Sequence, residues 1–132
     1  MQEYKESAYS IQWDEKNEII RVKFLESFTK DFAKLFKRDA LRIGEEIKAL
    51  GKKVRVLNDV NEIPDSFVID STMEALLVDS TEYADKIASY GEGSRAMDIS
   101  LSISAIVHFI MKRKDMRFFK TQQEAEKWLM QE

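Results

Sequence analysis

The feature that most constrains the fold is a long amphipathic helix between two stretches rich in β-forming residues. From Phe28 to Leu50, apolar residues recur every three or four positions, which is the repeat of one helix face. Ser27 or Thr29 can cap the start of this helix, and Gly51 suits the position after its end. A helix that follows one strand and leads directly into another indicates an α/β layer.

Short β-favouring runs lie on both sides of this helix. SAYSIQW and EIIRVKF flank the polar turn DEKN and predict a β-hairpin, and KKVRVLND (52–59) predicts a strand at the centre of the sheet. ADKIASYG (84–91) and MRFFK near the C-terminus predict two more strands. We therefore expect a five-stranded, mixed and mostly parallel sheet covered by helices, in the order β-β-α-β-α-β-α-β-α.

Three further helices complete this order. DSTMEALLVDS begins with Ser71 and Glu74 at the spacing of a capping box, and Thr121 with Glu124 forms a second box ahead of the last helix. The helix that begins at Ser94 has an apolar face wider than a single packing stripe. Three interpretations of that width stay open: core packing, the interface of a homodimer, or a cavity for an amphipathic ligand.

Length and composition limit the class of protein. A chain of 132 residues is long enough for one domain, spanning 1–132, and too short for two ordinary ones. Because the chain has no Cys, it has no disulfide, no thiolate nucleophile and no Cys-ligated metal, which favours a reducing, cytoplasmic setting. The most apolar run, ISLSISAIVHFIM, is shorter than a membrane span, so we expect no transmembrane segment.

Charge is unevenly distributed along the chain. The net charge of −3 argues against a general nucleic-acid binder. Residues 56–85 contain eight acidic residues and neither Lys nor Arg, whereas residues 112–120 contain five basic residues. That basic run suits either a solvated turn or contact with phosphate or an acidic membrane. The acidic pairs match no calcium or magnesium motif, so we predict no metal site.

The chain resembles the SpoIIAA-like or STAS-like family of small α/β domains. The likeness rests on KKVRVLND, on DST at 70–72, on DKIASYG followed by SR at 94–95, and above all on MRFFKTQQEAEKWL. It covers nearly the whole chain, and its last segment is the most specific part. The resemblance implies a non-catalytic module, since domains of this kind mostly bind proteins and some bind nucleotides or lipids.

The resemblance also implies a regulatory serine. In antagonist members of the family, a partner kinase phosphorylates a Ser in an Asp-Ser-Ser/Thr-Gly motif at the start of a helix. Asp70, Ser71 and Thr72 match that motif residue by residue, but Met73 stands where the family has Gly. The likeness therefore places a phosphoswitch at Ser71, and the departure at Met73 counts against it.

Two hypotheses follow, and both are non-enzymatic. The first is a regulatory or scaffolding module that binds a protein partner through one edge of the domain, formed by Asp59, Ser66, Asp70, Ser71 and Thr72. The second is a carrier or sensor of a small amphipathic or anionic ligand, a lipid or nucleotide, bound near the third helix with its anionic group at Gly91, Gly93, Ser94 and Arg95.

An enzyme is the least favoured class. The chain has a single His, His108, which falls inside a helical pattern with no nucleophile facing it. We predict no catalytic residue and no cofactor.

Overall fold

The computed structural model describes residues 3–27, 29–67, 70–72, 74–76, 83–93, 95, 96, 98, 99, 101, 102 and 115–131. Some predictions made from the sequence fall outside this part of the chain. These are the environment of His108, most of the wide apolar helix, and the basic residues at 112–114.

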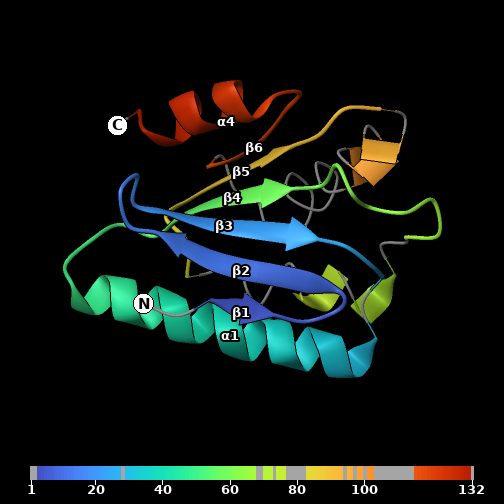
Figure 1. The fold of residues 1–132 in the computed structure, drawn as a ribbon, viewed down its shortest axis with the longest axis horizontal. Helices are drawn as coiled ribbons and strands as arrows, with labels where there is room; N and C mark the ends of the chain where they lie inside the picture. The colour runs from blue at the N-terminus through green and yellow to red at the C-terminus, as the bar shows by residue number, and fades with distance from the viewer. Residues whose placement is uncertain are drawn as a thin grey trace.

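The described residues form an α/β fold around one mixed sheet with strand order β1-β2-β3-β4-β5-β6 (Figure 1). The strands are β1 (Tyr4–Lys5), β2 (Tyr9–Asp14), β3 (Ile19–Phe24), β4 (Arg55–Asp59), β5 (Lys86–Tyr90) and β6 (Met116–Phe119). The pairs β1–β2 and β2–β3 are antiparallel, and the three later pairs are parallel. The predicted hairpin, the central position of β4 and the mostly parallel pairing are confirmed.

Within the described residues the sheet has six strands, not the predicted five. The additional strand is β1, whose Tyr4 lies opposite Ile11 of β2. A strand of two residues is too short to show the alternation of apolar and polar residues on which strand prediction depends. The N-terminal edge of the sheet was missed for this reason.

The long helix is α1 (Lys30–Ala49), and both of its ends were predicted. The Thr29 side chain accepts a hydrogen bond from the backbone N–H of Phe32 at 3.2 Å, so Thr29 rather than Ser27 is the N-cap. Gly51 has φ +75°, the left-handed conformation that ends a helix with little strain only in glycine. The apolar face predicted from the sequence packs against the sheet.

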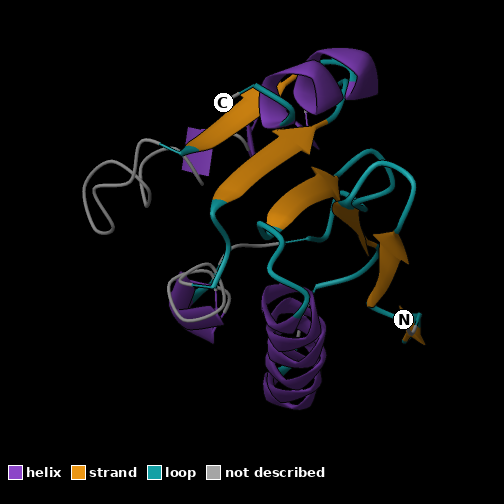
Figure 2. Cartoon of the chain, turned by 90° about the vertical axis from the view of Figure 1, so that its left-hand side faces the viewer, coloured by secondary structure: helices purple, strands orange, loops and turns teal. Residues whose placement is uncertain are grey.

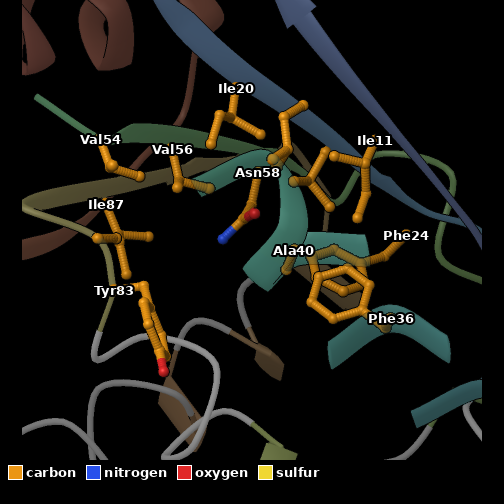
Figure 3. A pocket seen from close by; sticks show the side chains of 13 residues that line it. Ile11, Ile20, Phe24, Phe36, Ala40, Val54, Val56, Asn58, Tyr83 and Ile87 are labelled. Atoms are coloured by element: carbon orange, nitrogen blue, oxygen red, sulfur yellow. The ribbon is translucent and has the colours of Figure 1, made fainter. Parts of the chain in front are cut away.

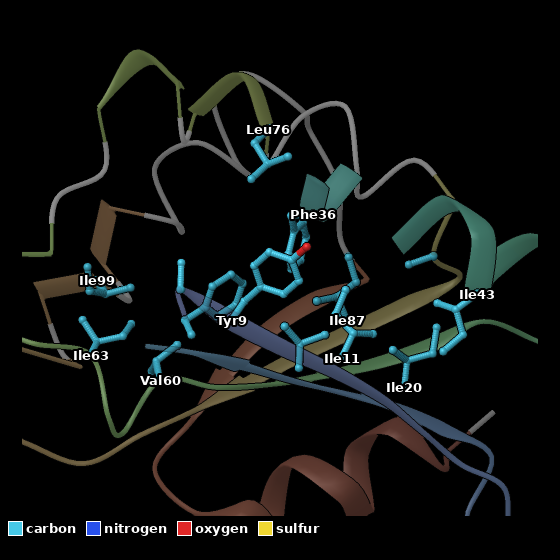
Figure 4. Close-up of a cluster of buried hydrophobic side chains, with 14 of the residues drawn as sticks. Tyr9, Ile11, Ile20, Phe36, Ile43, Val60, Ile63, Leu76, Ile87 and Ile99 are labelled. Carbon is cyan, nitrogen blue, oxygen red and sulfur yellow. The ribbon is translucent and has the colours of Figure 1, made fainter. Parts of the chain in front are cut away.

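Helices cover both faces of the sheet (Figure 2). On one face, α1 packs together with helical residues 71, 72 and 74–76, called here the Ser71 segment, and with 95, 96, 98, 99, 101 and 102, called the Arg95 segment. Figure 4 shows Leu76 and Ile99 pointing into the same apolar core as Phe36. Right-handed crossovers between sequentially ordered parallel strands place all their connections on one face.

The opposite face carries α4 (Gln122–Leu129), which follows the edge strand β6 and turns back over the sheet. Thr121 caps this helix by accepting a hydrogen bond from Glu124 N at 3.2 Å, as predicted. Ala125 and Leu129 are fully buried and form a second core cluster with residues of β3, β4 and β5. The final aromatic strand and helix are therefore the last layer of the fold.

A buried polar contact joins α1 to β2. The Tyr9 hydroxyl donates to Asp39 Oδ2 at 2.7 Å, and Arg38 Nε donates to Asp39 Oδ1 at 3.0 Å. Both Tyr9 and Asp39 are buried, and Phe36 packs edge-on against the Tyr9 ring. Burying a carboxylate is unfavourable unless it is hydrogen-bonded, and these two donors satisfy it.

No helix in the described part of the chain is long and apolar enough to cross a membrane.

Candidate functional site

The loops that follow β4 and β5 lie side by side at the carboxyl ends of the parallel strands. Asp59 pairs with Tyr90 in the ladder, and Val60 N donates to Tyr90 O at 3.1 Å. Asp59 Oδ1 accepts hydrogen bonds from the backbone and side chain of Asn61, whose own Oδ1 accepts one from Glu92 N at 3.0 Å. These hydrogen bonds join the two loops at one edge of the sheet.

Gly91 stands at the tightest point of this edge. A Cβ at this position would lie 2.7 Å from Val60 Cγ2 and 3.0 Å from Ala96 Cβ, so no larger residue fits without a shift of its neighbours. Gly93 has φ +100°, a conformation that residues with a side chain rarely adopt. These two glycines let the chain pass closely from β5 into the Arg95 segment.

At the anion site predicted at residues 91–95, some of the hydrogen-bond donors are already bonded to other groups of the protein. Gly91 N donates to Phe119 O at 3.2 Å, and Glu92 N is bonded to Asn61. Arg95 Nη1 lies 4.0 Å from Asp98 Oδ2. Ser94 lies outside the described residues. Anion binding at Gly91, Gly93, Ser94 and Arg95 therefore stays a prediction.

The five residues predicted to form one functional edge are divided between the two faces of the sheet. Asp59 lines a cleft on the α4 face, whereas Ser71 and Thr72 line a groove beside α1. Asp70 and Ser66 are exposed, and the Ser66 carbonyl accepts a hydrogen bond from Ser27 Oγ at 3.3 Å. The structure thus brings Ser71 and Thr72 together but does not place Asp59 with them.

The groove beside α1, called the α1 groove, has a volume of about 430 Å³. It runs between the first turns of α1 and the Ser71 segment, which meet at the carboxyl ends of the strands. Its apolar lining comes from Ala33, Ala75 and Leu76. Ser71 and Thr72 contribute hydroxyls on one side, and Lys30, Lys34 and Lys37 lie on the other.

The three lysines follow the repeat of α1. Positions i, i+4 and i+7 share one side of a helix, and at about 1.5 Å per residue they extend over roughly 10 Å. Lys30 and Lys34 are exposed, and neither makes an ion pair with any residue in the described ranges. The α1 groove therefore presents positive charge along one rim of an apolar floor.

A second hollow, of about 320 Å³, lies on the α4 face where that helix leaves β2 and β3 uncovered. Arg21 lines this hollow and already forms two ion pairs. Its guanidinium lies 2.9 Å from Asp14 Oδ2 and 2.6 Å from Glu126 Oε1. Lys23 pairs with Glu62 at 3.4 Å. With its cations neutralised, this cleft is polar but offers no net positive charge to a ligand.

Tyr90 forms one wall of the same cleft. Its hydroxyl donates to Gln122 Oε1 at 3.4 Å. Burial, together with the nearby negative charge of Asp59, raises the pKa of Tyr90 to about 12. Tyr90 is therefore a neutral hydroxyl near pH 7.

A third hollow is the apolar cavity between α1 and the sheet (Figure 3). Its volume is about 60 Å³, and Asn58 and Tyr83 are its polar lining residues. Asn58 is tied to Ser89 by a hydrogen bond of 3.2 Å. Pockets that hold small organic ligands measure roughly 300–1,000 Å³, so the volume of this cavity lies below that range.

Among the residues that the structure describes, no three His, Cys, Asp or Glu side chains are grouped so that they could hold a metal ion. No protein-family model matches the chain, and no curated protein sequence does.

The row of lysines beside the α1 groove could have been predicted from the sequence. Lys30, Lys34 and Lys37 have a regular helical spacing on a helix whose bounds were predicted correctly. The apolar positions of α1 predict its buried face but carry no information about its charged positions. The other wall of the α1 groove could not be predicted, because the sequence carries no signal for how the Ser71 segment packs.

Proposed function

We propose that this chain is a non-catalytic regulatory or scaffolding module of the SpoIIAA-like or STAS-like type, and that it binds another protein in the α1 groove. The observation that carries the proposal is the groove itself, with about 430 Å³ of volume, an apolar floor and a basic rim. Its volume falls in the range of binding pockets, about 300–1,000 Å³.

The chemistry of the groove defines the partner surface that would fit it. Small side chains at Ala33 and Ala75 allow close approach, which suits an amphipathic helix laid in the groove. Lys30 and Lys34 would face carboxylates that flank the apolar stripe of that helix. The partner segment is therefore acidic at its margins and apolar at its centre.

The resemblance of Asp70, Ser71 and Thr72 to the antagonist motif adds a means of control. Ser71 is exposed and lies on the rim of the groove opposite the lysines. A phosphate on Ser71 would bring about two negative charges into the groove, where it would compete with an acidic partner for Lys30 and Lys34. Phosphorylation would then release the partner.

Site-specific photo-crosslinking in host cells tests this proposal. A photoreactive residue placed at Ala75 or Ala33 should yield a discrete adduct with another protein, whereas the same residue at Gln123, which is exposed on α4, should not. The adduct should disappear in the Lys30→Gln/Lys34→Gln variant and persist in Arg55→Gln/Arg117→Gln, which removes the same charge elsewhere. Equal adducts at all three positions, or none in the groove, would contradict the proposal.

A further inference from the structure

Four basic side chains gather at the amino ends of β4, β5 and β6, at the opposite end of the strands from the α1 groove. We call them the cation cluster: Lys53, Arg55, Lys86 and Arg117. Arg55 and Lys86 are direct partners in the ladder between β4 and β5. The cluster therefore assembles from three segments that are remote in the sequence.

Three of these side chains share the face of the sheet that carries α4. Leu57 and Ala88 are buried beneath that helix, and side chains two positions apart on a strand point to the same face. Arg55 and Lys86 lie two positions before them, and Arg117 is the ladder partner of Ala88. Two of them, Lys86 and Arg117, reach the Trp128 ring on the last turn of α4.

Trp128, on that last turn, contacts two members of the cluster. Lys86 Nζ lies 4.3 Å from the centroid of the Trp128 ring, and Arg117 Cζ lies 5.9 Å from it. Lys86 Nζ also donates to the carbonyl oxygens of Trp128 and Gln131, at and just beyond the end of the helix. The indole ring also packs against Phe119, with 5.7 Å between the ring centroids.

Lys53, Arg55 and Arg117 form no ion pair with any residue in the described part of the chain. The neighbouring carboxylate of Asp85 accepts a hydrogen bond from Val54 N at 2.8 Å. Burial and then the charges of Arg55, Lys53 and Arg117 lower the pKa of Lys86, as expected where cations repel one another.

We propose that the cation cluster binds a small phosphate-bearing anion, with the guanidinium groups of Arg55 and Arg117 contacting phosphate oxygens beside Trp128. A guanidinium group presents paired donors that match two oxygens of a phosphate. A dianion of the phosphomonoester or pyrophosphate type relieves the repulsion among several cations at once. Lys86 acts as a positioning residue, because its ammonium is already directed toward the end of α4.

Fluorescence of Trp128 provides the first test. The chain has two tryptophans, so Trp13→Phe leaves Trp128 as the only one. Pyrophosphate, titrated at constant ionic strength, should change this fluorescence saturably with a Kd below about 1 mM and should raise Tm. Absence of saturation at about 10 mM would overturn the proposal.

Variants then locate the site. In the Trp13→Phe background, Arg55→Gln/Arg117→Gln should weaken pyrophosphate binding at least about tenfold. Lys30→Gln/Lys34→Gln removes the same charge from the α1 groove and should leave binding unchanged. Equal weakening in both variants would show a non-specific charge effect and would overturn the site.

Two further measurements separate the alternatives. Without ligand, Arg55→Gln/Arg117→Gln should have a Tm no lower than the parent, because it removes like-charge repulsion. A lower Tm would mean that these arginines stabilise the fold.

Co-sedimentation with phosphatidylcholine vesicles that contain phosphatidic acid, combined with no response to pyrophosphate, would assign the cluster to a lipid surface and overturn the small-anion proposal. Because neither outcome involves the α1 groove, the protein-binding proposal is tested separately.

Discussion

Replacing Gly91 by alanine tests the close contact between the loops that follow β4 and β5. The new Cβ would lie 2.7 Å from Val60 Cγ2 and 3.0 Å from Ala96 Cβ, whereas ordinary contacts begin at 3.4 Å. Val60 is 3% exposed, and its β-branched side chain has little rotational freedom. The methyl group must therefore move by about 0.7 Å into a packed core.

The expected cost combines two opposing effects. Forcing an extra methyl group into a packed site destabilises a protein by about 1–3 kcal/mol. The φ angle of Gly91 is not positive, so alanine adopts this backbone and gains about 0.4–1 kcal/mol by reducing the freedom of the unfolded chain. We therefore expect Gly91→Ala to lower the free energy of unfolding by about 1–2 kcal/mol, measured by urea denaturation.

A double-mutant cycle tests whether the contact with Val60 is the cause. Val60→Ala alone should cost about 2 kcal/mol, because it removes buried methyl groups, but it also opens space for the alanine at Gly91. The two changes together should cost less than their sum by about 1 kcal/mol. Additivity within about 0.5 kcal/mol would refute the steric explanation.

Gly93→Ala serves as the matched control for this cycle. An alanine Cβ there would meet no atom within 4 Å, but φ is +100°. Its cost, about 1–2 kcal/mol, comes from the backbone alone. Because no steric contact is involved, Gly93→Ala and Val60→Ala should be additive.

Two tyrosines give further predictions. Tyr9→Phe removes one of the donors to the buried carboxylate of Asp39 and should lower the free energy of unfolding by about 1.5–3 kcal/mol in urea; a change below about 0.5 kcal/mol would show that the hydrogen bond is not needed. The pKa of Tyr90 is raised to about 12 in the folded protein, from an ordinary value near 10. The folded protein therefore favours the neutral hydroxyl, and this contribution to the free energy of unfolding is complete below pH 10. It is lost as the pH rises to 12. Between pH 9 and pH 11 the wild type should therefore lose about 1.4 kcal/mol more than Tyr90→Phe, and equal losses would contradict the assigned pKa.

Local signals predicted the elements of this fold well. The caps at Thr29 and Thr121 and the left-handed residue Gly51 each depend on residues within one helical turn, and each is confirmed. The short strand β1 was missed because pairing with β2, rather than its own pattern, holds it in the sheet. Asp39 was missed because it is polar, although its spacing from Phe36 places it on the buried face of α1.

Relations between strands were harder to predict. Alternation places Asp59 on the same face as Leu57, but the sequence does not say which helix covers that face. Asp59 and Ser71 were therefore grouped, whereas the structure puts them on opposite sides of the sheet. The cation cluster likewise depends on the register that aligns Arg55 with Lys86, which no local pattern encodes.

The geometry of parallel strands predicts that the two proposed sites act independently. The α1 groove lies at the carboxyl ends of the strands and the cation cluster at their amino ends (Figure 1). A five-residue strand such as β4 spans about 16 Å, roughly twice the Debye length of about 8 Å at physiological ionic strength. Charge removed at one site is therefore largely screened from the other. Any strong coupling between a protein bound at Lys30 and Lys34 and an anion bound at Arg55 and Arg117 would have to pass through a shift of the strands and helices that connect them.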